Sequence, residues 1–211
     1  MPTSVCLRGW ATLPFFWADL PLYPMNPQGV PDVPITLAVV GSRRALLAAF
    51  HRIGWTKADA QSPLTALHDA LAALFKRSYP TAPVSRLCLF GRLPDLVVEH
   101  ALGSVARRDH VRLWSIGRVD VGGGELRLAS ISRDVSVEVV RRSHLLRGTS
   151  HHIDPAVDAA RARLVHDLWA TGTVASVRKR PGVGPTRDGQ DASGDAYVTD
   201  GQVAVVVLRD P

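Results

Sequence analysis

The sequence predicts an α+β domain with two early helices, a mainly antiparallel β meander, one late helix and a C-terminal strand. Two observations carry this prediction. Apolar residues recur at helical spacing near residues 42–54, 62–75 and 154–172. In the middle of the chain, apolar and polar residues alternate with the period of two of half-buried strands, and no helical pattern separates these strands.

Composition supports a globular protein. The chain has 211 residues, of which 46% are apolar and 21% charged, so a folded core is expected rather than disorder. Two cysteines exclude a disulfide scaffold and a cysteine-rich zinc cluster. No apolar stretch reaches the roughly 18 residues that a transmembrane helix needs, and we expect no signal peptide.

The net charge of +6 comes mainly from arginine, since only three of the 25 basic residues are lysine. Residues 101–150 hold nine arginines against five acids. A GC-rich genome would explain this skew, but guanidinium groups also match carboxylate and phosphate geometry. No helix carries a basic stripe, so we expect no nucleic-acid partner; a membrane surface or a small phosphorylated ligand fits better.

The first 34 residues form a segment rich in proline and aromatic residues, which we interpret as an N-terminal arm (1–34) before a single domain (35–209). So many prolines exclude a regular helix or central strand. The arm either lies across the domain and buries its aromatic side chains, or serves as an interfacial membrane anchor.

The early elements have clear ends. Residues 35–40 form an apolar run typical of a buried strand. Ser42 is a predicted cap for the first helix, and Gly54 ends it. Ser62 and Pro63 begin the second helix, which the prolines of 80–83 terminate.

Short strands are predicted in the middle of the chain at 87–90, 96–98, 110–114, 126–128 and 135–139. Turns are expected near Pro94 and Asp95, at the glycines 122–124 and at 132–134.

The late helix is predicted to start with Asp154 as cap and Pro155 in its first turn, and to bury Val157, Leu164, Val165, Leu168 and Trp169. A loop should follow from Arg178 to Gly201, and 203–208 should form the last strand.

His151, His152 and Asp154 crowd the start of the late helix. A helix N-terminus favours anions, and imidazole and carboxylate groups can bind metals or transfer protons. The alternative is that Asp154 only caps the helix and that the two histidines point in different directions.

A second candidate set is His110, Arg112 and Trp114, which share one face of a strand because strand side chains alternate. They could form the floor of a site for an anionic ligand, or a solvated outer face. We expect the imidazoles of the late helix to lie against this stripe and to form a shared cationic hollow. No nucleotide-binding, serine-hydrolase or dinucleotide motif occurs, and neither a cofactor nor a metal site is predicted.

The chain resembles the family defined by the C-terminal domain of LssY. The resemblance rests on Tyr79-Pro80-Thr81-Ala82-Pro83-Val84-Ser85, His110-Val111-Arg112-Leu113-Trp114, Thr149-Ser150-His151-His152-Ile153-Asp154-Pro155, and Gly182-Val183-Gly184-Pro185-Thr186 with Thr199-Asp200-Gly201. It adds Asp134 and Asp158 to the candidate ligand-binding positions. It implies a bacterial, membrane-associated accessory domain without an established activity. Where the family tends to read D-A-E-R-D, this chain has Asp158-Ala159-Ala160-Arg161-Ala162, and it therefore lacks two acids.

Two functions remain open. The first is a non-catalytic module that recognises an anionic lipid surface or a membrane-protein partner. The second is a metal- or histidine-dependent phosphoester hydrolase in which His110, His151 and Asp154 converge and Arg112 steadies the anion. The missing acids favour the first.

Overall fold

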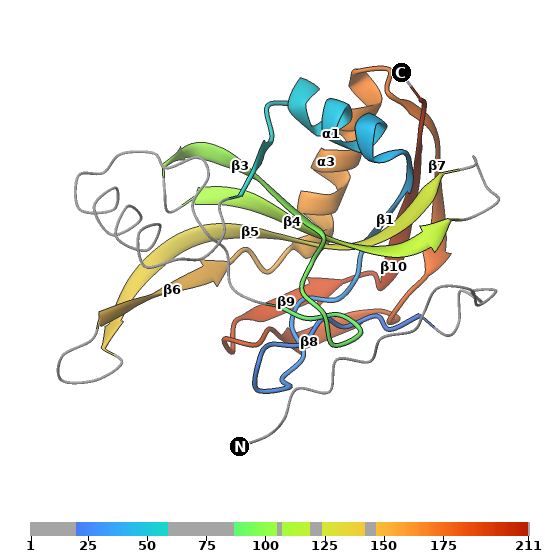
Figure 1. Ribbon diagram of the computed structural model, residues 1–211. Helices are drawn as coiled ribbons and strands as arrows, with labels where there is room; N and C mark the ends of the chain where they lie inside the picture. Colours follow the sequence, from blue (N-terminus) through green and yellow to red (C-terminus); the bar gives the residue numbers. More distant parts are fainter. Residues whose placement is uncertain (1–19, 59–86, 105–106, 119–123, 142–146, 211) are drawn as a thin grey trace.

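The computed structural model describes residues 20–58, 87–104, 107–118, 124–141 and 147–210. One large mixed sheet has two helices on one face, and a hairpin and irregular segments on the other (Figure 1). The elements are β1 (Leu37–Gly41), α1 (Arg43–Arg52), β2 (Thr56–Lys57), β3 (Leu96–Ser104), β4 (Arg107–Arg118), β5 (Glu125–Arg141), β6 (Arg147–Ile153), α3 (Val157–Ala170), β7 (Val174–Pro181), β8 (Thr186–Gln190), β9 (Ala196–Thr199) and β10 (Gln202–Leu208).

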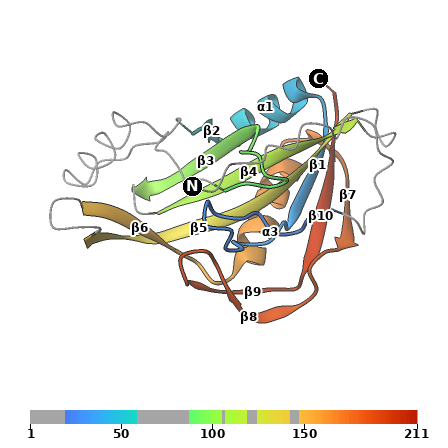
Figure 2. The ribbon, with the colours of Figure 1, turned by 60° about the horizontal axis from the view of Figure 1, so that its bottom comes forward.

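The sheet has eight strands in the order β2-β3-β4-β5-β1-β10-β7, with β6 paired to β5. β1 and β10 are parallel, and the other neighbours are antiparallel. Asp134 of β5 pairs with Arg108 of β4 and also with Ile153 of β6, so β4 and β6 occupy opposite edges of β5. Figure 2 shows the resulting β5–β6 ribbon extending past the ends of the neighbouring strands.

The predicted fold class is wrong. The described residues are mostly β, with 50% strand and 17% helix, and among them α1 is the only early helix, which follows β1. The predicted helix at 62–75 lies outside the described residues. The meander of β3, β4 and β5 is only part of a larger mixed sheet. Local periodicity could not reveal this, because β1 and β10 come from opposite ends of the domain.

The first helix is confirmed. Ser42 is its N-cap, and its Oγ accepts a hydrogen bond of 3.1 Å from the N–H of Ala45. The helix buries Leu46 and Phe50 against the sheet. Gly54 follows with a φ of +77°, a conformation that suits glycine.

Three other local predictions are wrong. The expected turn at 132–134 lies inside β5, where Ser132 and Asp134 pair with β4. Residues 87–90 form only isolated bridges, Met25 with Cys88 and Leu89 with Arg92. The expected loop at 178–201 contains the second half of β7 and all of β8 and β9. Polar residues in a strand resemble a turn or loop when their cross-strand partners are unknown.

The late helix starts later than predicted. It begins at Val157 after Ala156, and Asp154 instead accepts a 2.9 Å hydrogen bond from the N–H of Ala156 in the preceding turn. Leu164 and Leu168 are buried as expected, whereas Trp169 is 55% exposed.

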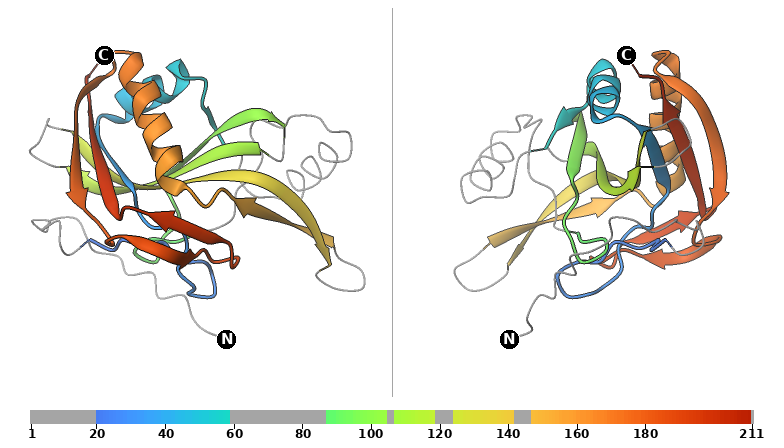
Figure 3. Two further views of the ribbon diagram at one scale, coloured as in Figure 1. Left: turned by 180° about the vertical axis from the view of Figure 1, so that it is seen from behind. Right: turned by 45° about the vertical axis from the view of Figure 1, so that its right-hand side comes forward.

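The two faces of the sheet have separate apolar cores. On one face, α1 and α3 cover a cluster that includes Val39, Val111 and Leu113. On the other, Leu20, Ile35, Leu87 and Leu89 pack with Trp114, Leu128 and other sheet residues. Figure 3 shows from two further directions that α1 and the β8–β9 hairpin lie on opposite sides of the sheet. Within the part of the chain that the structure describes, neither helix combines the length and hydropathy that crossing a bilayer requires.

The turn between β9 and β10 gives a test of the fold. Gly201 has a φ of +69°, and a Cβ there would lie 2.0 Å from the backbone of Gly184. Gly194 has a φ of +92° but open space around it. We expect Gly201→Ala to lower the free energy of unfolding by about 3 kcal/mol or more, and Gly194→Ala by about 1 kcal/mol. Urea unfolding measures both values, and equal losses would contradict the close approach.

Candidate functional site

A row of buried polar side chains crosses β3, β4 and β5 on the face opposite the helices. Its members are at most 6% exposed, and we call them the polar row: Glu99, Arg108, His110, Arg112, Ser130, Ser132 and Asp134. They share one face because directly paired residues of neighbouring strands project to the same side. The register pairs His110 with Glu99 and Ser132, Arg108 with Asp134, and Arg112 with Ser130.

His110 lies between two carboxylates. Its Nε2 is 2.9 Å from Oδ2 of Asp134, and its Nδ1 is 3.6 Å from Oε2 of Glu99. Burial lowers the pKa of His110, although the charge and the hydrogen bond of Asp134 act in the opposite direction. The neutral ring therefore donates from Nε2 to Asp134. No hydrogen-bond partner for Nδ1 is present among the described residues.

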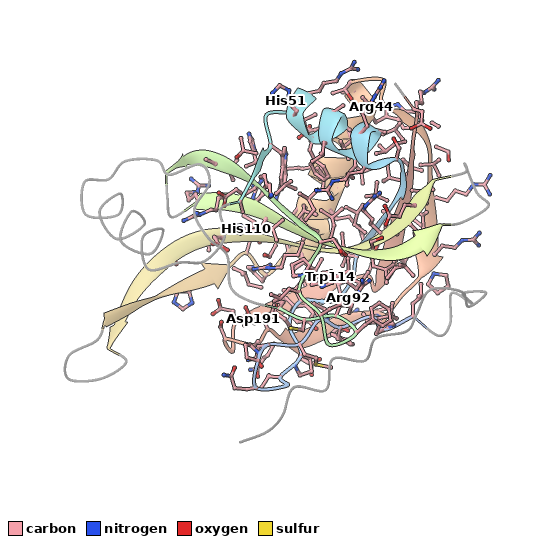
Figure 4. The ribbon with its side chains drawn as sticks, viewed as in Figure 1. Arg44, His51, Arg92, His110, Trp114 and Asp191 are labelled. Atoms are coloured by element: carbon pink, nitrogen blue, oxygen red, sulfur yellow. The ribbon has the colours of Figure 1, made fainter. Side chains whose placement is uncertain are left out.

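The two arginines of the row are held by acids. Nη1 of Arg108 is 3.4 Å from Oε2 of Glu99. Burial lowers the pKa of Arg112, and the negative charges of Asp32, Asp134 and Asp191 oppose this shift. These acids come from the N-terminal arm, from β5 and from the β8–β9 hairpin, so three distant segments place negative charge around one guanidinium. Figure 4 shows Asp191 below His110 and Trp114.

His110, Arg112 and Trp114 are at most 6% exposed, which excludes the alternative that they form a solvated outer face. Removing an ion network from water costs free energy, and hydrophobic residues of similar volume often stabilise a protein as well or better. Buried titratable groups with shifted pKa values are therefore candidates for function as well as for structure.

Trp114 lies on the same face but belongs to the apolar core. It is fully buried with Leu89 and Leu128 in the cluster opposite the helices. Its Nε1–H donates a 3.2 Å hydrogen bond to the backbone oxygen of Arg92. The indole therefore borders the polar row and packs with the apolar side chains.

The two histidines before the late helix lie in β6. His152 pairs with Ser136, and its Nδ1 is 2.8 Å from Oδ1 of Asp195 in the β8–β9 hairpin. Oδ2 of Asp195 accepts a 3.0 Å hydrogen bond from the N–H of Ile153. The backbone of His151 pairs with Val137, and its side chain lies outside the described residues. Asp195 therefore fixes the His152 ring and also attaches the hairpin to β6.

Asp158 connects α3 to the turn before β10. Its Oδ1 accepts a 2.9 Å hydrogen bond from Oγ1 of Thr199, and its Oδ2 accepts one of 2.5 Å from the N–H of Asp200. Buried Arg161 donates to both carboxylate oxygens of Asp200 and to the backbone oxygen of Gln202. Burial alone would raise the pKa of Asp200, but hydrogen bonds from Arg161 and from the N–H of Gln202 lower it. These contacts give Asp158 a structural role.

The structure thus brings some of the predicted site residues together and separates others. His110, Arg112 and Asp134 share the polar row, Trp114 borders it, and His152, Asp154 and Asp158 make other contacts. The expected cationic hollow is not found in the described residues, because carboxylates accompany both the stripe and His152. Within these same residues, no group of three or more His, Cys, Asp or Glu side chains is arranged to hold a metal ion.

Sequence reasoning missed Glu99, Arg108, Asp191 and Asp195. Glu99 and Arg108 could have been found from the alternation of side chains along a strand. Glu99 is an acid inside the apolar run 96–102, and Arg108 lies two residues before His110 and therefore on the same face of its strand. Nothing local indicates the hairpin acids. Asp191 accepts hydrogen bonds from the N–H groups of Ser193 and Asp195, a pattern typical of any tight turn.

The position of His110 predicts a pH dependence of stability. Since burial places the folded pKa below the 6.5 of an unfolded histidine, the unfolded chain binds more protons as the pH falls. The contribution of neutral His110 to the free energy of unfolding is fully present above pH 6.5 and decreases below it. Between pH 7.5 and 5, we expect the wild type to lose more stability than His110→Gln, by at most about 1.4 kcal/mol per pH unit.

Urea unfolding at several pH values measures this difference. Glutamine retains an N–H that can donate to Asp134, and His51→Gln on the exposed side of α1 controls for the loss of an imidazole elsewhere. Parallel pH profiles for the wild type and His110→Gln would contradict the neutral buried ring.

Comparison with known proteins agrees with the resemblance seen in the sequence. The family model described as LssY C-terminus matches residues 17–203. No curated protein and no solved structure gives a significant match. The matched range includes the polar row, the β8–β9 hairpin and both described helices. The chain therefore belongs to the LssY C-terminus family.

Proposed function

We propose that this domain is a non-catalytic binding module that recognises an anionic surface beside a bacterial membrane protein. The observation that carries the proposal is the excess of exposed arginine on the two helices that cover one face of the sheet. We call α1 and α3 the helical layer. Its exposed charged residues are four arginines and one acid: Arg43, Arg44, Arg52, Arg163 and Asp167.

The segments 20–35, 87–95 and 186–199 on the opposite side have no such excess. Their exposed charged residues are two arginines and two acids: Arg92, Arg187, Asp95 and Asp188. The arginines of the polar row are buried beside carboxylates and contribute little to the outer field. The exposed charges of the helical layer therefore sum to +3, and this layer attracts anions more strongly than the loop and hairpin segments opposite it.

The surroundings of His110 also favour binding over catalysis. A general base needs a ring nitrogen within reach of the proton that it abstracts. In His110, one nitrogen contacts Asp134, the other faces Glu99, and the side chain is 3% exposed. This arrangement suits an internal ion network better than contact with a substrate.

Vesicle co-sedimentation tests the proposed function. We expect the full chain to bind vesicles of phosphatidylcholine with phosphatidylglycerol, and to bind pure phosphatidylcholine weakly. Raising the salt from 0.1 to about 1 M shortens the screening length from about 10 to 3 Å and should release the protein. Binding that ignores both lipid charge and salt would contradict the proposal.

A phosphoester hydrolase is the second candidate, and the pair His152–Asp195 favours it. An acid that holds Nδ1 of a histidine at 2.8 Å orients the ring, as the acid of a hydrolytic triad does. The His152 side chain is 39% exposed, so this imidazole is accessible, unlike that of His110.

Turnover of p-nitrophenyl phosphate tests this second function. If the pair is catalytic, His152→Ala should lower kcat by 100-fold or more, the magnitude of general acid–base catalysis being roughly 10²–10⁴-fold. Asp195→Asn should lower kcat while the protein stays folded by circular dichroism. His166→Ala, an exposed histidine of α3, is the control. Absence of turnover in the wild type, or equal turnover in all variants, would remove the hydrolase.

A further inference from the structure

We propose that the outer side of α1 is the contact surface and that its occupant is an anionic lipid bilayer. This inference rests on the proposed function and adds the surface and the partner to it. The polar row takes no part in it.

The packing of α1 defines its outer side. Ala45, Leu46, Ala49 and Phe50 are buried against the sheet. Residues three and four apart on the other side of a helix form one stripe, here Arg44, Leu47, Ala48 and His51. Figure 4 shows the side chains of Arg44 and His51 at the upper edge of the molecule, on the far side of the sheet from Asp191.

The formal charges on α1 are all positive. Arg43 and Arg52 flank the stripe, and α1 contains no acidic residue. All three arginines of α1 are exposed. An anionic surface therefore meets no like charge on α1 itself.

Apolar side chains distinguish a bilayer from other polyanions. Leu47 is 39% exposed on the outer side of α1, in the stripe that contains Arg44 and His51. Trp169 is 55% exposed on α3, in the same helical layer. Guanidinium groups can bind lipid phosphates while exposed leucine and tryptophan side chains of the helical layer enter the interface, where Trp is favoured. The phosphate backbone of a nucleic acid, or an acidic protein surface, offers no apolar layer in which these leucine and tryptophan side chains could be buried.

Removal of the α1 charges tests the surface. The variant Arg43→Gln/Arg44→Gln/Arg52→Gln removes three charges and leaves the buried side of the helix intact. The matched control, Arg178→Gln/Arg180→Gln/Arg187→Gln, removes three exposed charges from β7 and β8. Arg178 and Arg180 pair with Val205 and Val203, whose side chains pack on the face opposite the helices.

We expect the α1 variant to bind phosphatidylcholine–phosphatidylglycerol vesicles roughly 100-fold more weakly than the wild type, about fivefold for each charge. The control should lose less than about fivefold. Thermal unfolding of both variants shows whether the fold is retained. Equal losses in the two variants, or no loss in the α1 variant, would overturn the α1 surface while the proposed function stands. No binding by the wild type would overturn the function itself.

Two further measurements test the bilayer as the occupant. Leu47→Gln, which keeps every charge, should weaken vesicle binding about tenfold and leave binding to heparin, a soluble polyanion, unchanged. Tryptophan fluorescence should shift to the blue on vesicle addition, and Trp169→Phe should remove most of this shift. Heparin or RNA binding as tight as vesicle binding, with no effect of Leu47→Gln on either, would overturn the bilayer in favour of a soluble polyanion.

Discussion

The structure depends on the position of β1 between β5 and β10. The parallel pairing with β10 joins the first and last regular strands of the domain, and the antiparallel pairing with β5 joins both to the middle of the chain. This placement defines two faces for the sheet. The crossover through α1 then occupies one face, and α3 packs on the same face, while residues 20–35 and the β8–β9 hairpin occupy the other.

The same division explains why the arginines of this protein fall into two classes. Arginines of β4 lie inside, where Glu99, Asp134 and acids from the arm and the hairpin neutralise them. Arginines of α1 lie outside, on a helix with no acid. Buried ion networks require internal neutralisation because an isolated charge away from water is costly, whereas exposed charges are free to act on the surroundings. The proposed attraction of an anionic partner is therefore assigned to the helical layer.

The β8–β9 hairpin links the separate groups of candidate residues. Asp195 holds His152 on β6, Asp191 faces Arg112 of the polar row, and Tyr197 packs with Val33 and with Val157 of α3. A segment that resembles a flexible loop by composition thus fastens β6, the arm and the late helix. Asp158 and Arg161, with Asp200, make comparable attachments between α3 and the turn before β10.

The sequence by itself determined the local features: the Ser42 cap, the burial of Leu46, Phe50, Leu164 and Leu168, the last strand and the shared face of His110, Arg112 and Trp114. These depend on residues within one or two turns or one strand, whose periodicity is visible in the chain. The sequence did not determine the exposure of Leu47 and Trp169, which the periodicity assigned to the buried sides. The tertiary structure decided the mixed sheet, the continuity of β5 through Asp134, and the burial of the polar row under charges from distant segments. Sheet pairing and ion neutralisation join residues far apart in the chain, and no local pattern records which partners meet.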